Sequence, residues 1–186
     1  AYNQKAEDRL ESLPFQDLIY IDPSRRDGNH KKIVSLEEYL PSIFELYATL
    51  ASKCQRLIIK CSPLIEWRSY LEKLPHCEEV LILSQRNDCK EICFCLNFNL
   101  DPKQIVAKLR TYNIEDTGLQ IFINNISDQK AVSFGSINNY LYLPNSSILK
   151  SGLMDSVAVE YGLSKLAKNT NVYSSDEVYK DFPGRI

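Results

Sequence analysis

The sequence predicts a protein of the α/β class with parallel strands covered on both faces and an antiparallel pair at the end. Continuous apolar runs at 17–21, 56–61 and 80–83 are typical of strands that are buried on both faces. Segments with apolar residues at helical spacing lie between these runs, which is the pattern of parallel strands joined by helices. The 186 residues are 44% hydrophobic and 25% charged. Such a chain can bury a sizeable core without a disulfide or a structural metal.

The chain opens with a short helix followed by a strand. Polar residues over 4–12 predict the helix, and the run 17–21 predicts a buried strand that ends at a segment rich in turn-forming residues. Ser35 and Glu38 have the spacing of a capping box. Apolar residues then recur at helical spacing, so we expect a helix over about 36–52.

Two further strands and a hairpin complete the first hundred residues. The run 56–61 predicts the second strand, and Ser62-Pro63 directly after it is typical of the start of a helix, which we expect to end near residue 75. The run 80–83 predicts the third strand. A polar turn then leads to a fourth strand over 91–98, which we expect to pair with the third.

The character of the chain changes near residue 100, where we place a domain boundary that separates residues 1–100 from 101–186. Asp101-Pro102 predicts the start of a helix that runs to about residue 112. The other elements expected in the second half are strands at 119–123 and 140–143 and helices at 146–151 and 155–167, separated by Gly152.

Charge and hydropathy exclude several classes of protein. Lys and Arg number 22 and Asp and Glu 24, which gives a net charge of -2. This balance excludes a strongly basic nucleic-acid coat protein but allows a local basic patch. No run of eighteen apolar residues and no signal-peptide pattern occurs, so we expect a cytoplasmic protein without a membrane partner. The first residue is not Met, and we expect the chain to be processed or to be part of a longer protein.

The six cysteines are expected to be reduced thiols rather than disulfides or metal ligands. Cys61, Cys93 and Cys95 lie in apolar runs, where a free cysteine behaves as a small hydrophobic residue. No Cys-x-x-Cys pair occurs, and His30 and His76 form no ligand spacing with the cysteines. We therefore expect no bound metal and a reducing compartment.

The strongest candidate site follows the first strand. In open α/β sheets, ligands bind beyond the carboxyl ends of the strands. Asp22 and Pro23 stand at that position, where a carboxylate and a carbonyl can accept hydrogen bonds from an amine or a base edge. Ser24, Arg25 and Arg26 follow, and Lys31 and Lys32 add positive charge that could contact a phosphate backbone. The alternative interpretation is a solvated loop after a strand.

The end of the second strand should flank the same cleft. Lys60 could neutralise a phosphate or a carboxylate, and Ser62 stands two residues further on. Cys61 between them could act as a nucleophile toward a pyrimidine ring, but no His lies nearby in sequence to activate it. Core packing is the default interpretation of Cys61.

Several blocks of sequence resemble one known family in order. In the first half they are Asp-Leu-Ile-Tyr-Ile-Asp-Pro-Ser-Arg-Arg at 17–26, Ile-Ile-Lys-Cys-Ser-Pro at 58–63 and Ser-Gln-Arg-Asn-Asp-Cys-Lys-Glu at 84–91. In the second half they are Tyr-Leu-Tyr-Leu-Pro-Asn at 140–145, Lys-Ser-Gly-Leu at 150–153, Ser-Asp at 175–176 and Pro-Gly-Arg at 183–185. Together they resemble a Bacteroidetes-type class I S-adenosylmethionine-dependent methyltransferase family with a THUMP-like domain at its C-terminus.

The resemblance implies a fold, a cofactor and a substrate. The fold would be the C-terminal half of a Rossmann-like methyltransferase sheet at 1–100, followed by a small α/β, THUMP-like module at 101–186. The implied activity is methyl transfer from S-adenosylmethionine to RNA. Asp22 and Pro23 would shape the acceptor pocket, and Ser24, Arg25, Arg26, Lys60 and Ser62 would bind the substrate. The family more often has Leu where this chain has Cys61, a departure that weakens a cysteine mechanism.

The resemblance also indicates what the chain lacks. A class I methyltransferase binds its cofactor with a Gly-rich turn after the first strand, but the six glycines of this chain include no Gly-x-Gly. The strand that ends at Asp22 would match the family's fourth strand. We therefore expect the chain to be the C-terminal part of a longer enzyme, inactive by itself, with its cofactor-binding residues unknown. A non-catalytic nucleic-acid-binding or interaction module, and a pyrimidine C5 methyltransferase that uses Cys61, stay open as alternatives.

Overall fold

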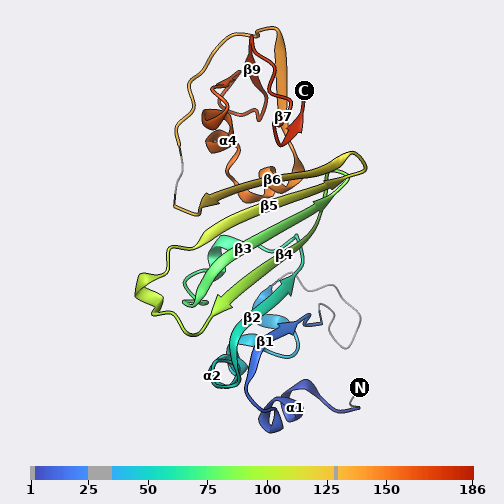
Figure 1. Cartoon of the computed structure of the whole chain (residues 1–186), viewed down its shortest axis with the longest axis vertical. Helices are drawn as coiled ribbons and strands as arrows, with labels where there is room; N and C mark the ends of the chain where they lie inside the picture. Colours follow the sequence, from blue (N-terminus) through green and yellow to red (C-terminus); the bar gives the residue numbers. More distant parts are fainter. Residues whose placement is uncertain (1–2, 25–34, 128–129) are drawn as a thin grey trace. The chain divides into compact units, whose positions relative to one another are not determined.

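The computed structural model describes residues 3–24, 35–127 and 130–186 (Figure 1). The predicted α/β class is confirmed, with a mixed six-stranded sheet in the order β1-β2-β4-β3-β5-β6 and few helices. Contacts divide the chain into two compact units. The first comprises 1–80 and 91–107, and the second comprises 81–90 and 108–186. The hairpin of β3 (Cys77–Gln85) and β4 (Asp88–Asn97) contributes residues to both units.

The first unit is built around parallel β1 and β2. Its elements, besides parts of β3 and β4, are α1 (Ala6–Ser12), β1 (Gln16–Ile21), η1 (Leu36–Glu38), α2 (Ile43–Lys53), β2 (Cys54–Cys61), η2 (Trp67–Tyr70) and η3 (Pro102–Gln104). Ile19 is the partner of Leu57 in the parallel pair, and Ile59 is the partner of Phe94 in the antiparallel pair of β2 with β4. Leu57, Ile59 and Phe94 are fully buried, so this face of the sheet forms the core.

The other face of β1 is open, which corrects the expectation of a fully buried strand. Leu18 and Tyr20 are 50% and 57% exposed. They alternate with Ile19 and Ile21, which are partly buried, so β1 is covered on one face only. An apolar run alone does not distinguish a strand covered on both faces from an apolar strand with one open face.

The predicted helix over 36–52 is wrong in its first half. Pro41 disfavours a helical conformation at Leu40, so the segment forms the short 3-10 turn η1 and then begins again as α2. The N-cap of α2 is Ser42, whose Oγ accepts a hydrogen bond from the backbone N–H of Glu45 at 3.4 Å. The capping box is not formed, because the hydroxyl of Ser35 donates to Glu37 instead.

The predicted helix after Ser62-Pro63 is also wrong. Only the 3-10 turn η2 forms there. Ile65 and Trp67 are both buried, and two residues spaced by two would point to nearly opposite sides of an α-helix. The guanidinium carbon of Arg68 lies 4.4 Å from the centre of the Trp67 ring.

The segment after Asp101 is a strand where a helix was expected. The start signal acts locally, since Asp101 Oδ1 accepts a hydrogen bond from the backbone N–H of Lys103 at 3.0 Å, but the turn η3 ends at Gln104. Leu109, Thr111 and Asn113 are buried at every second position, so the chain continues as β5 (Lys108–Glu115).

The second unit combines the β5–β6 hairpin with a small four-stranded sheet. Its further elements are β6 (Gly118–Asn125), β7 (Tyr140–Pro144), α3 (Ser146–Ser151), α4 (Met154–Glu160), β8 (Ser164–Lys165), β9 (Tyr173–Ser175) and β10 (Gly184–Arg185). The small sheet has the order β10-β7-β9-β8 and is antiparallel throughout. The predicted strands at 119–123 and 140–143 and the helix at 146–151 are confirmed, and Gly152, with φ of 79°, ends α3. The helix expected over 155–167 already ends at Glu160, before Gly162 with φ of 63°.

No helix within the described ranges is long and apolar enough to span a lipid bilayer.

Candidate functional site

Asp22 and Lys60 meet where β1 and β2 end. The two strands run parallel, as the sequence predicts, so their carboxyl ends lie at the same edge of the sheet. Lys60 Nζ donates a hydrogen bond to Asp22 Oδ2 at 2.7 Å. Pro23, next in the chain, is buried, while Asp22 is exposed. The structure therefore brings together the two charged residues that the sequence analysis placed beside the same cleft.

A third charged residue, Glu91, belongs to this cluster. Its Oε1 lies 3.7 Å from Lys60 Nζ, and its Oε2 is buried without a hydrogen-bond partner in the described part of the chain. The pKa of Lys60 is raised, chiefly by the hydrogen bond to Asp22 and further by the charge of Glu91. Sequence reasoning missed Glu91, because its position depends on the β2–β4 register, in which Lys60 is the partner of Cys93.

The cluster of Asp22, Lys60 and Glu91 is acidic at neutral pH. Two carboxylates face one ammonium group, which leaves one net negative charge. Such a cluster favours a ligand that brings a positive charge or N–H donors, because these satisfy the carboxylate oxygens that Lys60 does not neutralise.

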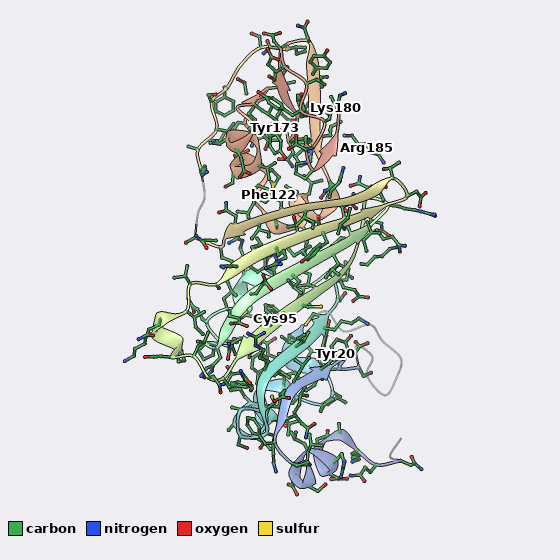
Figure 2. All side chains as sticks on the ribbon, in the orientation of Figure 1. Tyr20, Cys95, Phe122, Tyr173, Lys180 and Arg185 are labelled. Carbon is green, nitrogen blue, oxygen red and sulfur yellow. The ribbon has the colours of Figure 1, made fainter. Side chains whose placement is uncertain are left out.

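Tyr20 and Cys93 border the same cluster. Tyr20 projects from β1 (Figure 2), and its pKa is raised, chiefly by partial burial and further by the charges of Asp22 and Glu91. Burial raises the pKa of Cys93 to about 11, and Glu91 acts in the same direction. At neutral pH both groups are therefore protonated, so the cluster offers hydroxyl and thiol groups but no thiolate nucleophile.

A hollow of about 330 Å³ runs beside β1. It is lined mainly by apolar side chains from α1, β1 and α2, and Tyr20 and Asp22 also line it. β1 is the last strand in the sheet order, so its outer edge pairs with no strand in the described part of the chain. The unpaired edge and the apolar hollow thus lie directly beside the charged cluster.

The remaining predicted substrate residues have different surroundings. Ser24 is held by two backbone hydrogen bonds with Leu40, of 2.6 and 3.3 Å. Ser62 is buried, and its Oγ accepts a hydrogen bond from the backbone N–H of Leu64 at 3.2 Å, so this hydroxyl stabilises its own turn. Arg25 and Arg26, with the neighbouring Lys31 and Lys32, lie outside the described residues.

The cysteines show no feature of a reactive site. Cys61 is buried on the core face, and its Sγ donates to the carbonyl of Ile59 at 3.9 Å. Burial raises the pKa values of Cys77 and Cys95 to about 12. All six cysteines are free thiols. Among the residues that the structure describes, no group of three or more His, Cys, Asp or Glu side chains could hold a metal ion.

Comparisons with known proteins place this geometry in context. A family model described as a ferredoxin-like domain matches residues 140–183, which include β7, β8 and β9 of the antiparallel sheet of the second unit but not β10. A solved structure from Porphyromonas gingivalis W83, described as a putative methyltransferase, is 25% identical in sequence and superposes with a TM-score of 0.84. The match covers 96% of this chain but 45% of that chain, so this chain spans less than half of the Porphyromonas protein. None of the curated proteins matches the chain.

Proposed function

We propose that this chain is the C-terminal part of an S-adenosylmethionine-dependent methyltransferase that acts on RNA. The observation that carries the proposal is the likeness to the Porphyromonas structure over 96% of the chain. The sheet order of the first unit, with antiparallel β4 beside parallel β1 and β2, supports the same proposal. Residues 140–183, which match the ferredoxin-like model, would form part of the THUMP-like, RNA-binding module.

In this proposal Asp22 and Pro23 form the acceptor pocket. The carboxylate of Asp22, held by Lys60 at 2.7 Å, accepts a hydrogen bond from an N–H group of the target base and orients it. Buried Pro23 fixes the backbone at the end of β1, which limits the positions that the carboxylate can take. The negative charge of the cluster suits an acceptor with an amino group, whose N–H donors match the carboxylate oxygens.

The cofactor requires residues that this chain does not supply. S-adenosylmethionine provides the methyl group, but the chain contains no Gly-x-Gly turn that could approach the cofactor closely. The hollow beside β1 is lined mainly by apolar side chains. The 186 residues alone should therefore bind S-adenosylmethionine weakly or not at all, and tight one-to-one binding in calorimetry would contradict this part of the proposal.

The unpaired edge of β1 supports the proposal of a longer enzyme. An edge strand with exposed Leu18 and Tyr20 is a place where further strands can add to a sheet. In the complete enzyme, strands that carry the cofactor site would pair there and cover the apolar hollow.

The full-length protein tests the proposal. It should transfer tritium-labelled methyl groups from S-adenosylmethionine to RNA. The double variant Arg25→Ala, Arg26→Ala should weaken RNA binding and reduce the salt slope by about two units if both arginines contact phosphate. RNA binding without any methyl transfer would instead favour the non-catalytic module. Loss of transfer in Cys61→Ser, with a trapped adduct on a fluorinated pyrimidine, would favour the cysteine mechanism.

A further inference from the structure

The role of Glu91 in the Asp22–Lys60–Glu91 cluster follows from its place in the sheet. Glu91 belongs to β4, Lys60 belongs to β2 and Asp22 directly follows β1, three strands that are neighbours in the sheet order (Figure 1). Cys61 and its partner Ile92 are buried in the core. Lys60 and Glu91 each stand one position away from this pair, so both lie on the opposite face of the sheet. The ammonium group of Lys60 therefore lies between two carboxylates.

The hydrogen bonding of its own fold does not account for a carboxylate at position 91. Glu91 Oε1 lies 3.7 Å from Lys60 Nζ, which makes an ion pair but is too long for a hydrogen bond. Glu91 Oε2 is buried and has no hydrogen-bond partner in the described part of the chain. A buried polar atom without a partner destabilises a fold and calls for an explanation outside packing. The one charged group that Glu91 faces at short range is the ammonium group of Lys60, which points to a role toward that residue.

The contact between Lys60 and Asp22 benefits from a second restraint. A lysine side chain has four rotatable bonds and loses conformational entropy when it is held in one position. Its partner carboxylate at Asp22 is 46% exposed, so water competes for the hydrogen bond of 2.7 Å. Glu91 attracts the same ammonium group from β4. The two carboxylates together restrict Lys60 more than either does alone.

We infer that Glu91 is a positioning residue, which acts on the acceptor through Lys60 and Asp22. This inference rests on the proposed function, because the acceptor pocket belongs to it. Lys60 bonds Oδ2 of Asp22, and no described residue donates a hydrogen bond to Oδ1. The charge of Glu91 keeps the ammonium group at Oδ2, so Oδ1 stays available to an N–H group of the target base. Without Glu91, Lys60 can turn across both oxygens or into solvent, and Asp22 no longer holds one orientation.

Glu78 provides a matched comparison on the same sheet. Its Oε1 lies 3.8 Å from a guanidinium nitrogen of Arg56 in β2, close to the distance between Glu91 and Lys60, and the side chains of the two glutamates are 28% and 31% exposed. Glu78 Oε2, however, accepts a hydrogen bond from Asn97 Nδ2 at 3.1 Å. Arg56 precedes Lys60 by four residues, roughly 13 Å along the strand. Glu78 is therefore too distant to act on the acceptor pocket.

Methyl transfer by the full-length protein with Glu91→Gln tests the inference. The change keeps the shape of the side chain but removes the charge that restrains Lys60, so the turnover number should fall about tenfold. The KM for RNA should stay close to that of the wild type, since phosphate contacts supply most of the affinity. Glu78→Gln should keep full turnover. Both variants should keep the wild-type midpoint of urea denaturation, which separates a loss of turnover from a loss of folding.

A double-mutant cycle measures whether Glu91 acts through Lys60. In the Lys60→Met background, Glu91→Gln should lower turnover by less than about twofold, because the link to Asp22 is already broken. A purely structural role would give the same tenfold loss in both backgrounds. If the wild type is active, full turnover in Glu91→Gln or two losses that multiply would overturn this inference alone. A full-length wild type without methyl transfer would overturn the proposed function, and this inference with it.

Discussion

Each unit of the chain contains an Asp–Lys pair with a third polar group, but the two clusters differ in how exposed they are and in how fully their polar atoms are hydrogen-bonded. In the first unit Lys60 lies between Asp22 and Glu91, its side chain is 22% exposed, and Glu91 Oε2 has no partner in the described part of the chain. In the second unit Lys165 is 9% exposed and contacts both carboxylate oxygens of Asp155, at 2.8 and 3.2 Å. Tyr173 donates to the same carboxylate at 2.5 Å.

The difference separates a structural cluster from a candidate binding site. The Asp155–Lys165–Tyr173 cluster is closed, because each member satisfies the others, and its removal should cost stability. The Asp22–Lys60–Glu91 cluster is more exposed than the other cluster and has one carboxylate in excess, so it should contribute less to stability and can accept a ligand. Changes in each cluster should therefore affect different properties of the protein.

The largest effect on stability is expected for Lys165→Met. This change leaves the carboxylate of Asp155 without its cation beside buried Tyr173, and should lower the free energy of unfolding by about 2–3 kcal/mol, since Asp155 stays partly exposed. Urea denaturation followed by circular dichroism measures the loss. A change below about 0.5 kcal/mol would mean that the closed cluster is not structural.

The second largest effect is expected for Tyr173, which should make the free energy of unfolding depend on pH above pH 10. Burial raises its pKa well above 10, and the hydrogen bond to Asp155 adds to this shift. Because the folded pKa exceeds the unfolded value, the contribution to stability is complete below pH 10 and is lost as the pH rises above 10, by up to about 1.4 kcal/mol per pH unit.

Tyr173→Phe tests this pH dependence. The variant should be less stable at pH 7 by about 1–2 kcal/mol, since it loses one hydrogen bond to a charged acceptor. Its free energy of unfolding should then fall less steeply than that of the wild type between pH 10 and 11.5. Parallel curves for the two proteins would show that Tyr173 does not control the alkaline loss.

The smallest effect is expected for Lys60→Met. Ion pairs near the surface contribute about 0–1 kcal/mol, and Asp22, the nearer partner of Lys60, is about half exposed, so the free energy of unfolding should change by less than about 1 kcal/mol despite the loss of contacts to Asp22 and Glu91. Urea denaturation in parallel with Lys165→Met gives the comparison directly. An equal loss in the two variants would remove the distinction between the clusters.

The sequence predicts those parts of the fold that depend on local apolar pattern. The strands at 17–21 and 56–61 and their parallel pairing were predictable from continuous apolar runs, and this pairing brings Asp22 to Lys60. The prediction of a helix over 101–112 was wrong. It relied on the helix start signal at Asp101-Pro102 and overlooked the two-residue period of the side chains at 109–113, which is typical of a strand. The prediction of a helix over 36–52 overlooked Pro41, which disfavours a helical conformation at the residue before it.

Glu91 shows what local pattern cannot provide. It reaches Lys60 only through the antiparallel register of β2 and β4, and register depends on side-chain packing across strands that are distant in sequence. The open face of β1 was also not predictable from the sequence, because Leu18 and Tyr20 belong to an apolar run and are nevertheless about half exposed.

The most direct test of the account is the turnover number of the full-length protein with Asp22→Asn. Turnover should fall about 100-fold or more, because the variant loses the charge that orients the acceptor, while RNA affinity and the free energy of unfolding stay close to those of the wild type. Asp116→Asn, a change at an exposed carboxylate that pairs with Arg86, is the matched control and should keep full turnover. Full turnover in Asp22→Asn would contradict the assignment of the acceptor pocket to the end of β1.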